Sequence, residues 1–214
     1  MARKWFFDPL KPGAYNKIIA DPPTHFSTFS PFESAKGPQY PLMSDSWLRS
    51  LQVRHLAAAD CLMMLWTTMP KLPFSIELLG EWGFRYVTAG SWHKCHANGA
   101  TAFGTGFVLR SGAELYLIGA TGKPLYVNRP AKGVIVTEDD HDREFIDLTT
   151  NAEGLEAIRR EHSRKPDEQY EIMNKLMGDA PACEIFARQQ WPGYDAWGNQ
   201  PDHFKPVDER DDQS

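Results

Sequence analysis

The amino-acid sequence predicts an α/β sandwich with a mostly parallel central sheet. Short apolar runs of strand length alternate along the chain with segments of helical periodicity, which is the order typical of this fold class. Of the 214 residues, 42% are hydrophobic and 24% are charged, a composition that suits one globular domain with a sizeable core. Ligands bind beyond the carboxyl ends of the strands in such sandwiches, so residues that directly follow a strand are the first candidates for a functional site.

The first predicted strand covers residues 15–21, YNKIIAD. Its apolar residues are bounded by polar ends, and it stops at Pro22, which has no N–H group to continue a strand ladder. Asp21 is therefore expected at the carboxyl edge of the sheet.

A helix is predicted to begin after Ser44, because serine is a good N-cap residue. Residues 60–68, DCLMMLWTT, predict a second buried strand. Residues 69–83 predict another helix, which tolerates proline in its first turn and ends at Gly83. The expected buried face of this helix carries Leu72, Ile76 and Leu79. A strand over residues 84–92 completes a β-α-β-α-β order.

The second half of the chain continues this alternation. Residues 113–120, AELYLIGA, and residues 133–136, GVIV, are predicted strands. A helix is predicted over residues 166–177, because a proline stands at its start and a glycine just beyond its end. Residues 182–188, ACEIFAR, predict the last strand, which places Arg188 at the same edge of the sheet as Asp21.

Charge and cysteine content exclude several classes of protein. The net charge of −5 argues against binding nucleic acid through a global basic field, although a local basic site remains open. The three cysteines are odd in number and far apart, which favours a reducing compartment over a disulfide framework.

No apolar stretch is long enough to span a bilayer, so we expect a soluble cytoplasmic protein with no membrane contact. His93, Cys95 and His96 lie close together, but their spacing matches no zinc signature and no metal is predicted.

The Asp21-Pro22-Pro23 stretch carries the most specific chemistry. The exocyclic amine of adenine is a poor nucleophile, because its lone pair is delocalised into the ring, and its alkylation needs acceptors for both N–H bonds. The carboxylate of Asp21 and the carbonyl of Pro22 could supply them, on a turn that the prolines make rigid. A chance Asp-Pro-Pro is expected in roughly one such sequence in ten, so a rigid turn with an aspartate cap is the alternative interpretation.

Six segments, taken in order, resemble motifs of one enzyme family. They are ADPP, YPLMSD, LMMLWTT, RSGAELYLIGATGKP, REHSRKPDEQYEI and CEIFARQQWPGYDAWGNQ. Together they cover most of the chain and resemble the MT-A (mRNA adenosine methyltransferase) group of S-adenosylmethionine-dependent adenine-N6 methyltransferases, particularly its bacterial and phage members. The resemblance implies a Rossmann-like methyltransferase sandwich of permuted order, in which the catalytic motif precedes the cofactor-binding strand.

The resemblance also implies a cofactor, a function and a set of site residues. The cofactor would be S-adenosyl-L-methionine, and the function methylation of the N6 amine of adenine in DNA. RNA methylation and a non-catalytic, nucleic-acid-binding partner subunit are the alternatives. The implied catalytic residues are Asp21, Pro22, Pro23 and Thr24. The implied cofactor contacts are Asp21, Lys165, Glu184, Arg188, Asn199 and Gln200. The expected contacts with the target are His25, Phe26, Tyr40, His93, Lys94 and Arg110.

Thr24 is the main departure from the family pattern, which has an aromatic residue in this position to stack on the flipped base. A threonine has no π face, and the loss of a stacking partner costs about 1–3 kcal/mol per base. We expect another ring, from His25, Phe26 or Phe29, to take this role in an active enzyme. A slow enzyme and one that no longer methylates are the other interpretations.

The remaining expectations concern the organisation of the chain. Residues 1–204 are predicted to form a single methyltransferase domain, with an insertion at about 136–157, and residues 205–214 to form a mobile acidic tail. The insertion could act as a flap, mediate dimer contacts or be an inert surface addition, which is the default. We also expect a homodimer, because a second copy would extend the basic surface of a modestly acidic chain.

Overall fold

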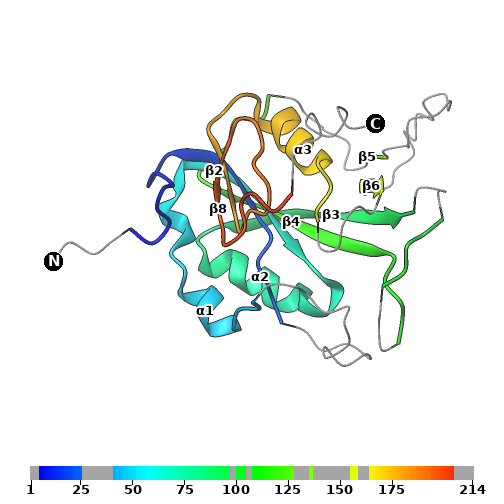
Figure 1. The fold of residues 1–214 in the computed structure, drawn as a ribbon. Helices are drawn as coiled ribbons and strands as arrows, with labels where there is room; N and C mark the ends of the chain where they lie inside the picture. Colours follow the sequence, from blue (N-terminus) through cyan, green and yellow to red (C-terminus); the bar gives the residue numbers. More distant parts are fainter. Residues whose placement is uncertain are drawn as a thin grey trace.

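A central sheet organises the chain in the computed structural model (Figure 1). The structure describes residues 5–25, 41–96, 100–104, 108–127, 135–136, 155–158 and 164–204. Phe26, Phe29 and Tyr40, most of the predicted insertion and the whole predicted tail lie outside these residues. No helix among the described residues is long and apolar enough to cross a membrane.

The sheet holds eight strands in the order β5-β6-β3-β4-β2-β1-β7-β8. Their bounds are β1 Tyr15–Ala20, β2 Ala57–Thr67, β3 Arg85–Cys95, β4 Ala113–Thr121, β5 Ile135–Val136, β6 Leu155–Ile158, β7 Ala182–Ile185 and β8 Tyr194–Trp197. Strand β4 runs antiparallel to its neighbours β2 and β3, and the other pairs are parallel. The predicted mostly parallel sheet is therefore confirmed.

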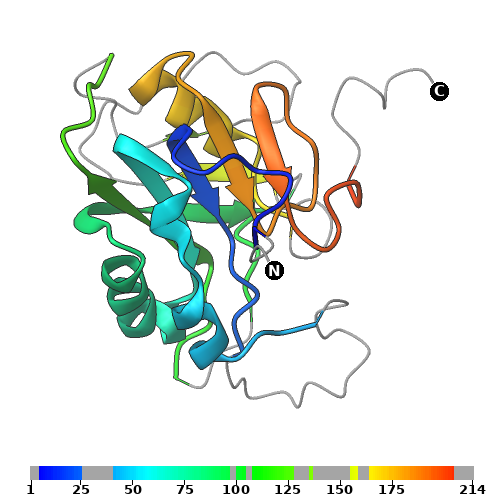
Figure 2. The ribbon, with the colours of Figure 1, turned by 90° about the vertical axis from the view of Figure 1, so that its left-hand side faces the viewer.

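The strand order is the permuted one that the resemblance implied. The first strand of the chain, β1, lies inside the sheet between β2 and β7, which comes much later in the sequence. In Figure 2 the blue arrow of β1 and the orange arrows of β7 and β8 lie side by side and point the same way. The Asp-Pro-Pro motif, which follows β1, thus comes before β7 in the sequence, although β1 and β7 end at the same edge of the sheet.

Helices cover both faces of the sheet. Helices α1 (Asp45–Ser50) and α2 (Leu72–Glu81) lie on one face and α3 (Glu168–Met177) on the other, as Figure 1 shows. Short 3-10 helices at Val53–His55 and Met69–Lys71 precede β2 and α2. Both faces of β1 are consequently buried, with Ile18 and Ile19 on opposite sides and each 0% exposed, which explains its nearly continuous apolar run.

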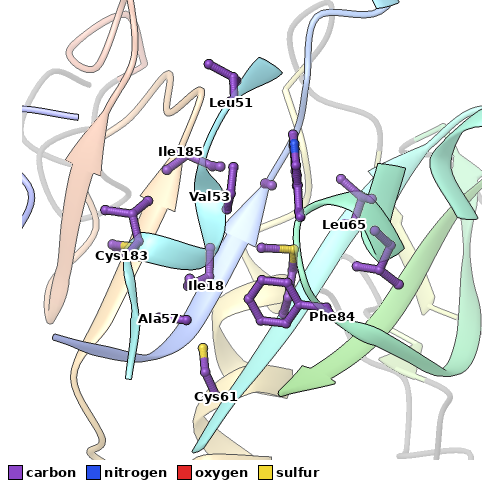
Figure 3. Packing of buried hydrophobic residues seen from close by; sticks show 14 of the residues in the cluster. Ile18, Leu51, Val53, Ala57, Cys61, Leu65, Phe84, Cys183 and Ile185 are labelled. Carbon is purple, nitrogen blue, oxygen red and sulfur yellow. The ribbon is translucent and has the colours of Figure 1, made fainter. Parts of the chain in front are cut away.

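The core between the sheet and α1 and α2 brings together side chains from distant segments. Figure 3 shows Ile18 of β1, Leu65 of β2 and Ile185 of β7 packed in one cluster with Phe84. On the opposite face, Tyr170 and two methionines of α3 pack against the sheet. The two clusters fix β1 and β7 from both sides, and with them the residues that follow these strands.

Local sequence signals set most element boundaries. Ser44 caps α1, because its Oγ accepts a hydrogen bond from the Trp47 amide at 3.2 Å. Gly83 and Gly178 follow α2 and α3 with φ of +83° and +61°, which glycine adopts without steric cost.

One expectation about the elements is wrong, and two of the strands, β6 and β8, were not predicted. Ile76 is 45% exposed, because α2 docks through Leu78, Leu79 and Trp82 toward its C-terminal end. Strand β8, Tyr194–Trp197, was not predicted. It is only four residues long and alternates buried Tyr194 with exposed Asp195, so pairing with β7 defines it more than its own apolar pattern does.

Candidate active site

Asp21 lies where the order of the strands reverses. Ala20, the last residue of β1, pairs with Leu65 of β2 on one side and with Ile185 of β7 on the other. The chain continues from β1 to β2 in one direction, whereas β7 continues to β8 in the other. Such a switch point leaves a crevice beyond the carboxyl ends of the strands, where α/β sheets bind their ligands.

Backbone hydrogen bonds reinforce the turn after β1. The Thr24 amide donates to the Pro22 carbonyl and the Met43 amide donates to the Pro23 carbonyl, both at 2.8 Å. The carbonyl of Pro22, predicted as the second acceptor for an amine, therefore already accepts one hydrogen bond. A carbonyl oxygen has two lone pairs, so one remains for a ligand.

A cavity of about 170 Å³ opens beside Asp21. Its polar lining residues are Asp21, Arg188, Asn199 and Gln200, and its aromatic ones are Phe6, Trp47, Phe186 and Trp197. The side-chain oxygen of Gln200 is buried and has no hydrogen-bond partner among the described residues. Because a buried acceptor without a partner is costly, this atom fits a ligand that brings a hydroxyl or amine donor.

The connections after β7 and β8 form one wall of this cavity. The Ala187 amide donates to the Trp197 carbonyl at 2.9 Å, and the ring centroids of Phe186 and Trp197 are 5.7 Å apart. A Cβ atom at Gly198 would lie 2.5 Å from the carbonyl oxygen of Ala187, so glycine is needed for this close approach. Phe186 itself has a φ of +64°, which is uncommon for a bulky residue and typical of functional sites.

A chain of ion pairs lies on the other side of Asp21. The Lys165 Nζ atom is 2.8 Å from Asp21 Oδ2 and 3.3 Å from Glu114 Oε2, and Lys94 forms an ion pair with Glu114. Burial raises the pKa of Asp21, against the opposing effect of Lys165. Burial also acts to raise the pKa of Glu114, but Lys165 and Lys94 together outweigh it and lower that pKa to about 2. Glu114 is therefore charged at neutral pH.

Glu184 and Asp21 both line a second, smaller hollow of about 20 Å³. Glu184 accepts a hydrogen bond from the Tyr170 hydroxyl at 2.5 Å, and Gln189 donates to that hydroxyl at 3.1 Å and to Asp167 at 2.9 Å. Burial raises the pKa of Glu184 to about 8, although the Tyr170 hydrogen bond opposes the shift. Asp21, Phe186 and Arg188 line both hollows, so they divide the site in two.

The structure gathers all six of the expected cofactor residues around the two hollows, whereas none of the expected target residues among the described ones lines either hollow. The set lining the two hollows is Asp21, Lys165, Glu184, Arg188, Asn199 and Gln200. His25 is exposed. His93 lies 3.0 Å from the Thr101 hydroxyl, and exposed Arg110 stacks on Phe103 in the segment between β3 and β4. Phe26 and Tyr40 lie outside the described residues.

Sequence reasoning missed Glu114, Trp47 and Phe6. Glu114 stands inside the quoted segment RSGAELYLIGATGKP, and an acid at the start of an otherwise apolar strand was the available signal. The two aromatic residues carried no comparable signal, because the cavity joins segments that are far apart in the chain.

An acid on a rigid turn at the switch point of a permuted Rossmann-like sheet, beside a partly aromatic cavity, fits the class of the methyltransferases. The chain belongs to the MT-A70 family, whose family model matches residues 15–200. MT-A70 methyltransferases use S-adenosylmethionine and act on nucleic acids.

Relatives come from bacteria, plants and animals. The chain is 30% identical over 210 residues to the Type II methyltransferase M.MunI of Mycoplasma sp. This match covers 90% of this chain and 80% of that protein. It is 29% identical over 201 residues to a probable N(6)-adenosine-methyltransferase MT-A70-like protein of Oryza sativa subsp. japonica, covering 92% of this chain and 24% of that one. It is 23% identical over 201 residues to the human N(6)-adenine-specific methyltransferase METTL4, covering 91% and 39% respectively. The chain thus spans less than half of these two eukaryotic relatives.

Proposed function

We propose that this protein transfers the methyl group of S-adenosylmethionine to the N6 amine of adenine in DNA, as a site-specific modification of prokaryotic or phage DNA. The placement of Asp21 carries the proposal, because this one carboxylate lines both the aromatic cavity and the charged hollow at the switch point. DNA is preferred because M.MunI, a Type II methyltransferase, matches over four fifths of its own length, whereas the rice MT-A70-like protein matches over 24% of its length.

The lining of the cavity suits the cofactor. The cofactor would supply an electrophilic methyl group on a positively charged sulfur. Asp21 offers a carboxylate to its ammonium group, and Arg188 offers a guanidinium to its carboxylate. The unpartnered oxygen of Gln200 suits a ribose hydroxyl, with Asn199 beside it, and the aromatic side chains suit the adenine ring.

Asp21 and Pro22 would prepare the target amine for attack. The carboxylate of Asp21 accepts one N–H and the free lone pair of the Pro22 carbonyl accepts the other, which directs the nitrogen lone pair toward the methyl group. As the bond from nitrogen to the methyl carbon forms, the carbon–sulfur bond breaks and its electron pair stays on sulfur. The amine proton then leaves to Asp21 or to water.

Stacking of the flipped base stays a prediction. Thr24 pairs through its backbone with Met43, and in the sequence it stands at the position of the usual ring. His25 is exposed next to it and offers a ring that could turn toward the base. If the His25→Ala variant keeps the affinity of the wild type for its target, His25 does not stack on the base.

Two other functions have specific support. The names of the MT-A70-like relatives, N(6)-adenosine-methyltransferases, favour RNA as the acceptor. Thr24 in the aromatic position favours a non-catalytic partner subunit. Against the latter, Lys165 and Asp21 form an ion pair in a buried setting, which a degenerate site need not keep.

Transfer of radiolabelled methyl to duplex DNA, single-stranded DNA and RNA separates the three functions. We expect transfer to DNA. Transfer to RNA alone would refute the choice of DNA, and S-adenosylhomocysteine binding without transfer to any acceptor would favour the partner subunit. Asp21→Asn tests the site, with Asp179→Asn as a matched control, because Asp179 is an exposed acid beyond the end of α3.

We further propose that residues 1–204 form one methyltransferase domain and that the protein is a cytoplasmic homodimer. A second copy would add basic surface for nucleic acid to a chain of net charge −5. Small-angle scattering at several protein concentrations tests the oligomeric state, and a monomeric mass throughout would refute the homodimer.

A further inference from the structure

The ion pairs beside Asp21 form a charge-balanced chain of four side chains from four segments. Asp21 follows β1 and Lys165 precedes α3, whereas Glu114 is the second residue of β4 and Lys94 the last but one of β3. The contacts run in that order, with Lys165 between two carboxylates and Glu114 between two ammonium groups. The side chains are between 13% and 24% exposed, so each charge depends on its partners more than on water.

Lys165 presents a problem for the proposed role of Asp21. Its ammonium group donates to Asp21 Oδ2 at 2.8 Å, so it competes for this carboxylate with the incoming amine and with the ammonium group of the cofactor. A charge-assisted hydrogen bond is stronger than one from a neutral amine, so the target would compete poorly for that oxygen. Moving Lys165 away without a new counter-charge would leave a buried cation unpaired, which is costly.

Glu114 offers a second acceptor for the same ammonium group. Its Oε2 atom is already 3.3 Å from Lys165 Nζ, so a small rotation of the lysine completes the exchange. Lys94 keeps Glu114 charged and fixes its position by a hydrogen bond to Oε1. Both ammonium groups also make cation–π contacts. Lys165 Nζ lies 5.6 Å from the ring centre of Trp66, and Lys94 Nζ lies 5.1 Å from that of Trp92.

We propose that Glu114, held by Lys94, is a positioning residue that shares Lys165 with Asp21 and takes it over when the target amine binds Asp21. The proposal rests on the proposed methyl transfer. Glu114 then acts in the reaction through Lys165, without touching the substrate. Lys94 acts through Glu114, because it holds that carboxylate in place.

The charges around Asp21 make the proposal measurable. Lys165 before α3 and Arg188 after β7 lower the pKa of Asp21, whereas Glu114 on β4 raises it. Glu184 on β7 also faces Asp21, and the two carboxylates act on each other. Neutralising Glu114 must therefore lower the pKa of Asp21, and neutralising Lys165 must raise it.

The test combines a titration with kinetics. The ¹³C signal of the Asp21 carboxyl group, assigned with Asp21→Asn, is followed against pH by NMR in the wild type, in Glu114→Gln and in Lys165→Met. We expect Glu114→Gln to lower the titration midpoint by roughly one pH unit and Lys165→Met to raise it. We also expect Glu114→Gln to raise the KM for DNA about tenfold, because Lys165 then stays on Asp21.

Controls separate this role from a structural one. Glu114→Asp should recover part of the KM, and Glu171→Gln, at an exposed acid of α3, should change neither readout. Lys94→Met should shift the Asp21 midpoint when Glu114 is present and leave it unchanged in Glu114→Gln. An unchanged Asp21 midpoint or an unchanged KM in Glu114→Gln overturns the proposal. A wild type that transfers no methyl refutes the proposed function instead, and the titration still decides whether Glu114 acts on Asp21.

Discussion

Replacing Gly198 even by alanine should weaken cofactor binding, because Gly198 lies against the backbone of the connection after β7. A Cβ atom at this position would lie 2.5 Å from the carbonyl oxygen and 2.8 Å from the nitrogen of Ala187. These are backbone atoms, so the chain itself must move, and overpacking of this kind costs about 1–3 kcal/mol. The segment that moves carries Arg188, so we expect Gly198→Ala to raise the Kd for S-adenosylhomocysteine at least about tenfold.

Gly80 in α2 provides the matched control. A Cβ atom there meets nothing within 4 Å, and alanine is the better helix former, so Gly80→Ala should stabilise the fold by about 0.5–1 kcal/mol. Urea unfolding measures both free energies, and isothermal titration calorimetry measures the affinity. If Gly198→Ala matches the wild type in stability and in affinity, the argument for a rigid cavity wall is refuted.

Three further predictions test the site and the core. Because burial raises the pKa of Glu184 to about 8 from 4.5, the folded protein holds a proton that the unfolded chain has lost, so stability falls as pH rises through this range. Glu184→Gln should remove this part of the pH dependence in urea unfolding, and an unchanged slope would contradict it. Trp47→Leu should raise the Kd for S-adenosylhomocysteine about tenfold by removing an aromatic contact of the cavity, whereas Phe103→Leu at an exposed ring should not. Ile18→Ala should lower the free energy of unfolding by about 2–5 kcal/mol, because Ile18 is fully buried. Ile76→Ala should change it by no more than about 0.5 kcal/mol, because Ile76 is exposed, and equal losses would argue against the described packing.

The strands and their ends could be predicted because their signals are local. Ile18 and Ile19 stand in a short apolar run closed by proline, which placed Asp21 at the edge of the sheet before its neighbours were known. The same holds for the cap at Ser44 and the stop at Gly83, since each depends on the backbone of a few adjacent residues.

The contacts of the site could not be predicted in the same way. Glu114 acquires its role from Lys94 and Lys165, which come from two other segments, and no single stretch of sequence holds that information. Trp47 and Phe6 reach the cavity only because α1 and the N-terminal segment fold against each other, with the two ring centroids 6.1 Å apart. The position of β8 likewise depends on its partner β7, and its own four residues are too few to predict a strand.

Asp21 is the residue on which the proposed function depends. Its substitution by asparagine keeps the size of the side chain but removes the charge that would align the amine. Losing such an electrostatic contact lowers turnover by about 10²–10³-fold in comparable sites.

The most direct measurement is the amount of N6-methyladenine formed in unmethylated duplex DNA, read by mass spectrometry of the digested nucleosides. We expect the wild type and Asp179→Asn to form N6-methyladenine in the presence of S-adenosylmethionine, and Asp21→Asn to form it about 10²–10³-fold more slowly while staying folded. Equal formation by Asp21→Asn and the wild type would refute the role of Asp21, and methyl groups at any position other than the N6 amine would refute the proposed function.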